Sequence, residues 1–182
     1  MKVFHLSVEC YPVAKVGGLA DVVGALPKYQ TKLGLEAAVV MPWYDRPFVR
    51  DHAFSIVHEG AFYQGTELLN YAVYKEDDNT LGFELYLIKI PGKLDRQEVY
   101  CYPDEGEQFV AFQHAVLHWF KEKGIVPGIV HCHDHHVGLM PFLMKYSNEY
   151  NFLAEVKTVA TVHNGQYQGW THWSKAILLP PF

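Results

Sequence analysis

The sequence predicts an α/β domain with a mostly parallel, Rossmann-like sheet, helices on both faces and a β-rich antiparallel insertion. The main observation is a strand–loop–helix–strand unit near the amino terminus. An apolar run at Val3–Val8 is typical of a buried strand, residues 11–18 form a loop with Pro and Gly, and Glu36–Met41 is again strand-like. The crossover in such a unit is right-handed and joins parallel strands, so a parallel sheet follows.

The segment between these strands has the period of a helix. Apolar residues recur at steps of three and four from Leu19 to Leu33, which gives one apolar face, and Gly34 is a typical terminator. Pro27 lies inside this helix and is expected to kink it.

The pattern changes to β-rich segments between Phe54 and Ile90. Gly65 and the cluster Asp77-Asp78-Asn79 separate these segments, so we expect an inserted antiparallel meander. The βα alternation then returns as a helix at Asp104–Lys123 that Gly124 ends, a strand at Ile129–Cys132, a helix at His136–Tyr150 and a strand at Val156–Val162.

Composition restricts the class of protein. A chain of 182 residues has the size of one domain, and 49% apolar against 19% charged residues is typical of a folded chain. The net charge of −5 comes without a dense Lys/Arg run, which argues against a nucleic-acid partner.

The first residues and the cysteines indicate the cellular compartment. His5 and Glu9 interrupt the apolar start, so no signal peptide is predicted, and no segment approaches the ~20 apolar residues that span a bilayer. The three cysteines are odd in number and lack a CxxC pair, which indicates neither a disulfide framework nor a zinc ribbon. We therefore expect a soluble cytoplasmic protein with no membrane partner.

The loop after the first strand is the first candidate site. Lys15, Gly17 and Gly18 lie between the end of a strand and the start of a helix. Glycines allow close backbone approach, and free N–H groups with the helix dipole attract an anion such as phosphate. A plain glycine turn remains an alternative, because the GxGxxG and GxxxxGK[ST] spacings are both absent.

The second candidate is the run His131-Cys132-His133-Asp134-His135-His136. Imidazole and carboxylate are good zinc ligands, so a metal-dependent hydrolase is a rival hypothesis. The hydrolase pattern H-x-H-x-D-H needs Asp at 135, where this chain has His, and a one-residue slip along a strand points a ligand the opposite way. We therefore expect no metal here, and polar capping of a strand end and helix start is the structural alternative.

The third candidate is Thr161-Val162-His163-Asn164, at the end of a predicted strand. Strand ends hold ligands in parallel sheets. On spacing alone, His163 is either a ligand-binding group or a structural histidine.

All of these segments resemble one family. Residues 9–27 resemble the opening motif E-x-x-P-x-x-K-x-G-G-L-A-D-V-x-G-x-L-P of bacterial glycogen synthases and plant starch synthases, which form glycosyltransferase family 5. Residues 131–139 are similar to the family's H-x-H-D-W-H-x-G-L, with His135 in place of Trp, and residues 161–169 to T-[VI]-H-N-x-x-Y-Q-G. The matches run from residue 3 to about residue 170.

The resemblance implies a two-domain GT-B fold, of which residues 1–182 form the single amino-terminal, acceptor-side domain, incomplete at its carboxyl end and without the second domain. It further implies retaining transfer of glucose from ADP-glucose or UDP-glucose to the non-reducing end of an α-1,4-glucan, with no metal or other cofactor. This segment alone is expected to be inactive, because the second domain carries much of the donor site. A catalytically inactive glucan-binding or regulatory module is the alternative.

The resemblance also implies site residues. They are the donor-phosphate ligands Lys15, Gly17 and Gly18, the catalytic residues Asp134 and His163, and the glucose or glucan contacts Asp21, Asn164 and Tyr100. The family's Trp is a large apolar platform, so His135 in its place is expected to alter the local packing.

Overall fold

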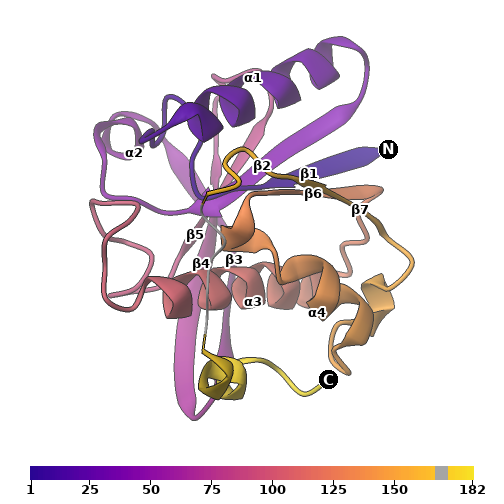
Figure 1. The fold of residues 1–182 in the computed structure, drawn as a ribbon. Coiled ribbons are helices and arrows are strands. Elements are labelled where there is room, and N and C mark those ends of the chain that lie inside the picture. Colours follow the sequence, from indigo (N-terminus) through magenta and orange to yellow (C-terminus); the bar gives the residue numbers. More distant parts are fainter. Residues whose placement is uncertain (167–171) are drawn as a thin grey trace.

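The computed structural model describes residues 1–166 and 172–182, and its centre is one seven-stranded sheet of order β3-β4-β5-β2-β1-β6-β7 (Figure 1). The strands are β1 Lys2–Leu6, β2 Glu36–Pro42, β3 Phe54–Gln64, β4 Glu67–Glu76, β5 Glu84–Lys89, β6 Ile129–His133 and β7 Lys157–Thr161.

Five neighbouring strands, β5-β2-β1-β6-β7, are parallel. Numbered along the chain, they have the doubly wound order 3-2-1-4-5. The order reverses between β1 and β6, which pair in register with His5 opposite His131. Sheets of this kind bind ligands beyond the carboxyl ends of the strands at that reversal, so the fold directs attention to the loops after β1 and β6.

The expected antiparallel insertion is present, but it continues the same sheet. β3 and β4 form a hairpin around Gly65, whose φ of +61° suits glycine, and β4 pairs antiparallel with β5. β5 in turn pairs parallel with β2, and the segment 84–89 is therefore a central strand of the domain.

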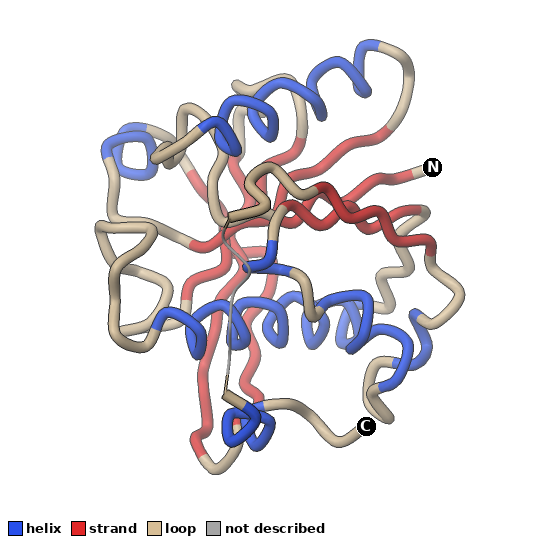
Figure 2. The backbone as a smooth tube through the Cα atoms, viewed as in Figure 1, coloured by secondary structure: helices blue, strands red, loops and turns tan. Residues whose placement is uncertain are grey.

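Helices cover both faces of the sheet, as the sequence predicted. Figure 1 and the tube view in Figure 2 place α1 and α2 on one face and α3 and α4 on the other. The helices are α1 Gly18–Lys32, α2 Pro47–Asp51, α3 Glu105–Lys123 and α4 Met140–Tyr146, with 3-10 helices η1 His135–Val137, η2 Asn151–Leu153 and η3 Trp173–Leu178. No helix in the described part of the chain is long and apolar enough to cross a membrane.

Helix bounds differ from the sequence-based expectation in one region. The single helix expected at residues 136–150 is wrong, because the chain there forms η1, then α4, then η2. Pro141 lies in the first turn of α4, where its missing N–H costs nothing, and it favours a new start over continuation of η1. α1 continues as one helix through Pro27, which is buried.

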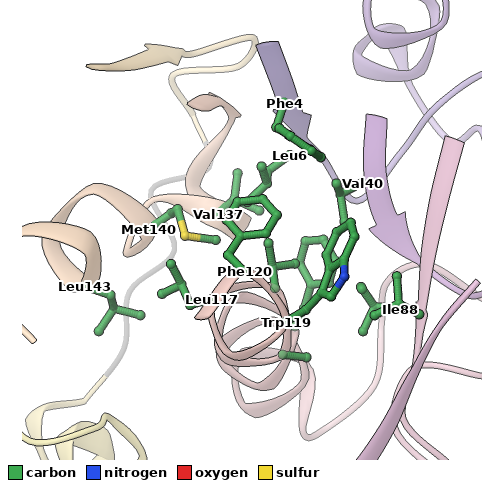
Figure 3. Close-up of a cluster of buried hydrophobic side chains, with 14 of the residues drawn as sticks. Phe4, Leu6, Val40, Ile88, Leu117, Trp119, Phe120, Val137, Met140 and Leu143 are labelled. Atoms are coloured by element: carbon green, nitrogen blue, oxygen red, sulfur yellow. The ribbon is translucent and has the colours of Figure 1, made fainter. Parts of the chain in front are cut away.

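The core lies in two layers, one on each face of the sheet. In Figure 3, Phe4, Leu6 and Val40 of the strands face Leu117 and Phe120 of α3. The second layer lies under α1 and α2 and includes Val8, Val23, Met41, Phe48 and Leu87. Each fully buried side chain of this size contributes about 1.5–3 kcal/mol, so these layers hold the strand ends in fixed positions.

Candidate functional site

The candidate site lies in the loops that follow β1, β6 and β7. β1 ends at Leu6, β6 at His133 and β7 at Thr161. Of the polar residues singled out from the sequence, Asp134, His163 and Asn164 follow β6 and β7 closely, Lys15 lies in the loop between β1 and α1, Asp21 in the first turn of α1, and Tyr100 in the loop that precedes α3. Parallel strands bring their carboxyl ends to one edge of the sheet, and for β1 and β6 that edge is the reversal point.

A buried carboxylate organises the glycine loop. Glu9 is 3% exposed, and its Oε2 accepts hydrogen bonds from the backbone N–H groups of Val16 over 2.6 Å and Gly17 over 2.8 Å. Its Oε1 accepts a hydrogen bond from the Tyr100 hydroxyl over 2.6 Å. The Gly17 N–H is therefore bonded to Glu9 of the same chain, so an anion at this loop would bind to other donors.

The glycines themselves leave open space. A Cβ built on Gly17 or Gly18 meets nothing within 4 Å, and Gly17 has a φ of −132° that any residue adopts. Gly24, in contrast, packs so tightly that a Cβ would lie 2.5 Å from the Tyr11 carbonyl oxygen. Among the described residues, neither packing nor backbone conformation requires glycine at positions 17 and 18. Within the described part of the chain, Glu9 is the side chain that bonds backbone N–H groups at this end of α1, those of Val16 and Gly17, and no such bond reaches Gly18.

Lys15 is held by a neighbour from α1. Its Nζ lies 2.7 Å from each carboxylate oxygen of Asp21, and its ammonium is 5.7 Å from the centre of the Tyr11 ring. The two side chains of the ion pair are 45% and 54% exposed. Exposed ion pairs are worth at most about 1 kcal/mol, so Lys15 can exchange Asp21 for a ligand anion at little cost.

Asp134 has a strained backbone at the end of β6. Its φ of 62° and ψ of −179° lie in a region that essentially only glycine occupies without cost. Its N–H donates to the Thr161 carbonyl over 2.9 Å, and its Oδ1 accepts from the His163 N–H over 2.6 Å. These two bonds hold the strained residue against the end of β7.

His163 is joined to β6 through its side chain as well. Its Nε2 lies 3.0 Å from Nδ1 of His133, and the two rings are stacked with centres 5.3 Å apart. Asn164 is exposed, and its Oδ1 accepts from the Gln166 N–H over 2.9 Å within its own turn. The remaining matched residues of this motif, Tyr167, Gln168 and Gly169, lie outside the described residues.

Tyr100 connects the loop after β1 to the turn after β6. Its hydroxyl donates to Glu9, and its ring stacks on His136 with centres 5.1 Å apart and planes inclined by 29°. Burial, followed by the Glu9 contact, raises the pKa of Tyr100, while burial lowers the pKa of His136 to about 4. The tyrosine therefore remains a neutral donor and the imidazole remains uncharged at neutral pH.

A pocket of about 670 Å³ lies beside this turn. Asp104, Glu105, His135 and His136 are among its lining residues, and Trp173 contributes from η3. His135, which stands in the place of the family's Trp, therefore lines a pocket with several acidic residues, and Lys15, Asp134 and His163 lie outside that pocket.

The structure brings a different set of histidines together than the metal hypothesis required. Among the described residues, ring nitrogens of His5, His131 and His133 lie within 4.8 Å of one another. Asp134 does not belong to this set, while His5 joins it from β1. These three imidazoles are the donors that could hold a metal in the described part of the chain.

Sequence reasoning assigned no function to Glu9 or His5. Glu9 is the fixed acid of the opening motif, and its position three residues after a buried strand could have indicated a role at the strand's end. His5 interrupts an apolar strand, and His131 and His133 are two residues apart, so they lie on one face of β6. A polar residue in a buried strand was the available signal.

Fold and site together define a doubly wound α/β domain with its polar groups gathered at the reversal point of the sheet. The chain belongs to the starch synthase catalytic domain family, which matches residues 2–181. The fold class expected from the sequence is thereby confirmed.

Curated relatives agree with this family. The chain is 50% identical over its whole length to a glycogen synthase of Flavobacterium johnsoniae, and covers 38% of that protein. It is 38% identical over 181 residues to a glycogen synthase of Geobacillus thermodenitrificans, with 93% of this chain and 35% of the relative covered. The chain thus spans little more than a third of these relatives.

A solved structure supports the same family. The catalytic domain of starch synthase IV from Arabidopsis thaliana, bound to ADP and acarbose, matches with a TM-score of 0.85 and 27% identity. The match covers 95% of this chain and 36% of that one.

Proposed function

We propose that this chain is the amino-terminal, acceptor-side catalytic domain of a glycogen synthase. The whole protein would transfer glucose from ADP-glucose or UDP-glucose to the non-reducing end of an α-1,4-glucan, with retention of anomeric configuration. Membership of the starch synthase catalytic domain family supports the reaction class. The observation that carries the proposal is the joining of groups from the loops after β1, β6 and β7 at the reversal of the sheet.

The donor is proposed to bind with its phosphates at the start of α1. Lys15 supplies a mobile positive charge that, among the described residues, contacts Asp21 in an exposed ion pair and the Tyr11 ring. Gly17 and Gly18 leave open space beside that charge. The related plant starch synthase structure was solved with ADP bound, which supports a nucleoside diphosphate as part of the ligand.

Asp134 and His163 are proposed as the residues that contact the transferred glucose. Backbone strain persists in proteins where the surroundings fix it, and it gathers at active sites, which supports a chemical role for Asp134. His163 is fixed through both its backbone and its ring. Rigid donors and acceptors of this kind stabilise charge that develops in a transition state without having to reorganise.

Asp21, Asn164 and Tyr100 are proposed as further contacts to glucose or glucan. Asp21 becomes free to accept a hydroxyl when Lys15 turns to a phosphate, and Asn164 is exposed. Tyr100 donates its hydroxyl proton to Glu9, and the oxygen keeps lone pairs that can accept from a sugar hydroxyl. We also propose a cytoplasmic location, which the free thiols of Cys10, Cys101 and Cys132 favour.

The test is a transfer assay with the full-length product of the gene. ADP-glucose labelled in the sugar is incubated with glycogen, and UDP-glucose is supplied in a parallel reaction. We expect label in the polymer, released by an enzyme that cleaves α-1,4 linkages. No incorporation from either donor would contradict the proposal. Retention on a glycogen affinity gel without transfer would then indicate a binding module, and metal-dependent glucan hydrolysis would indicate the rival hydrolase.

A further inference from the structure

A row of hydrogen-bonded side chains runs along the α1 face of the sheet to His163. Oε1 of Gln30, in α1, lies 2.7 Å from Nε2 of His5. Nδ1 of His5 lies 3.0 Å from Nε2 of His133, and Nδ1 of His133 lies 3.0 Å from Nε2 of His163. We call Gln30, His5 and His133 the imidazole row.

The two histidines of the row are uncharged at neutral pH. His5 and His133 are both 0% exposed. Among the described residues neither ring contacts a carboxylate, and a buried charge without a partner is costly, so both imidazoles stay uncharged. A neutral imidazole has one N–H donor and one acceptor nitrogen, so a ring that accepts at one nitrogen must donate at the other.

This rule gives the row a direction. The amide oxygen of Gln30 only accepts, so the proton of His5 is on Nε2 and its Nδ1 accepts from Nε2 of His133. Nδ1 of His133 therefore accepts from Nε2 of His163. The proton of a neutral His163 is then on Nε2, and its Nδ1 carries a free lone pair.

We infer that the imidazole row is a positioning device that holds His163 in the tautomer with the proton on Nε2, so that Nδ1 accepts a hydrogen bond from a sugar hydroxyl. The inference rests on the proposed function, in which His163 contacts glucose. Without the row, a free imidazole would exchange between tautomers, and part of the population would present an N–H to the hydroxyl instead. The row thus links α1 and the middle of the sheet to the site.

A bound metal would have the opposite effect. His5, His131 and His133 could ligate an ion through ring nitrogens that lie within 4.8 Å of one another. If Nε2 of His133 ligated a metal, its Nδ1 would carry the proton and donate to His163. His163 would then be protonated on Nδ1, so the tautomer of His163 distinguishes the two arrangements.

The experiment measures the tautomer of His163 directly. Histidine is isotope-labelled in the full-length protein, and long-range proton–nitrogen correlation spectra distinguish protonated from unprotonated ring nitrogens. The spectrum of His163→Asn assigns the signals. We expect the Nε2-protonated form in protein treated with a chelator. An Nδ1-protonated His163, or stoichiometric zinc bound after addition of zinc chloride and lost in His5→Phe, would overturn the inference.

Variants test whether the row causes this state. His5→Phe keeps the ring volume but removes the acceptor for His133, and we expect a mixture of His163 tautomers. Gln30→Leu removes the acceptor at the other end of the row. Gln30 is half-buried, so this variant is the substitute if His5→Phe does not fold. His114→Leu is the control, since His114 is equally buried but belongs to the other core layer. An unchanged single tautomer in both row variants would contradict the inference.

Kinetics give a second readout that a purely structural role would not reproduce. Loss of one hydrogen bond of this kind corresponds to about a 2- to 10-fold effect. We expect kcat of His5→Phe and Gln30→Leu to fall by this factor while KM for the donor stays unchanged. His114→Leu should keep the wild-type kcat. If the wild-type protein transfers no glucose, the proposed function fails, while the tautomer measurement still decides whether the row exists.

Discussion

The backbone N–H of His163 donates to the Asp134 carboxylate over 2.6 Å, and this bond ties together the ends of the neighbouring strands β6 and β7. Asp134 makes this contact from a backbone conformation, φ 62° and ψ −179°, that suits glycine. Such a conformation costs about 1–3 kcal/mol in other residues. A residue with a side chain therefore occupies a position that lowers stability, and this is the observation behind the chemical role proposed for Asp134.

Replacement of Asp134 separates its strain from its chemistry. Asp134→Gly relieves the backbone strain, whereas Asp134→Ala keeps the strain and removes the same carboxylate. Strain relief of about 1–3 kcal/mol, less about 0.5–1 for the entropy of glycine, predicts that the Gly variant is the more stable by about 1 kcal/mol, and by about 2.5 kcal/mol at most. Urea unfolding measures this difference. Equal stability would contradict the strain, and full glucose transfer by either variant would contradict the proposed role of Asp134.

The glycines of α1 are predicted to differ in what they tolerate. Gly17→Ala and Gly18→Ala should leave the free energy of unfolding within about 0.5 kcal/mol, because a Cβ there meets open space. If donor phosphates approach that backbone, the added methyl group should weaken their binding by about 1.4 kcal/mol or more. The rate of glucose transfer by the same variants should then fall at least about 10-fold.

Gly24→Ala is the matched control on the same helix. Its Cβ would lie 2.5 Å from the Tyr11 carbonyl oxygen, so overpacking should cost about 1–3 kcal/mol of stability. If Gly17→Ala and Gly18→Ala kept wild-type transfer, no ligand would approach the backbone closely at this point. If Gly24→Ala were as stable as the wild type, the packing around Tyr11 would differ from that described here.

The fold could largely be predicted from sequence because its signals are local. The apolar runs of β1 and β2 and the helical period of α1 each follow from a few consecutive residues. The place of β5 could not be predicted, because its parallel pairing with β2 depends on contacts between distant segments. The break between η1 and α4 depended on Gly138 and Pro141, whose effect the apolar pattern of residues 136–150 concealed.

The sequence could predict that the candidate residues lie near the strand ends, but not how their side chains connect. Lys15, Asp134 and His163 were identified because they follow strands and match family motifs. That Glu9 fills the backbone donors of Val16 and Gly17 depends on the three-dimensional path of the loop. The contact of His5 with His133 joins residues far apart in the sequence, and pairing of β1 with β6 creates it.

Buried histidines predict a loss of stability in acid. Burial lowers the pKa of His114 from 6.5 to about 4 in the folded protein, so the unfolded chain binds more protons between those values. Its contribution to stability is present above pH 6.5 and is lost as the pH falls, by about 1.4 kcal/mol per pH unit for one such group. His5, His133 and His136 act in the same direction.

His114→Leu isolates one of these contributions. Neither ring nitrogen of His114 has a hydrogen-bond partner among the described residues, so the substitution breaks no bond of the described chain. We expect unchanged or higher stability at pH 7, and a slope of unfolding free energy against pH that is smaller by about 1.4 kcal/mol per unit between pH 6.5 and 4. Urea denaturation at a series of pH values measures it. A slope equal to that of the wild type would show that His114 does not resist protonation.

The central claim is that the loop after β1 binds the donor phosphates, and the kinetics of Lys15→Ala in the full-length protein test it most directly. A hydrogen bond to a charged group is worth roughly 1.5–3 kcal/mol, so kcat/KM for the nucleotide sugar should fall about 10- to 150-fold. Lys15→Arg should restore only part of it, because a planar guanidinium replaces a compact ammonium. Lys28→Ala, an exposed lysine on the same helix, is the control and should change little. A Lys15→Ala protein with wild-type kinetics for donor and acceptor would contradict the assignment of this loop.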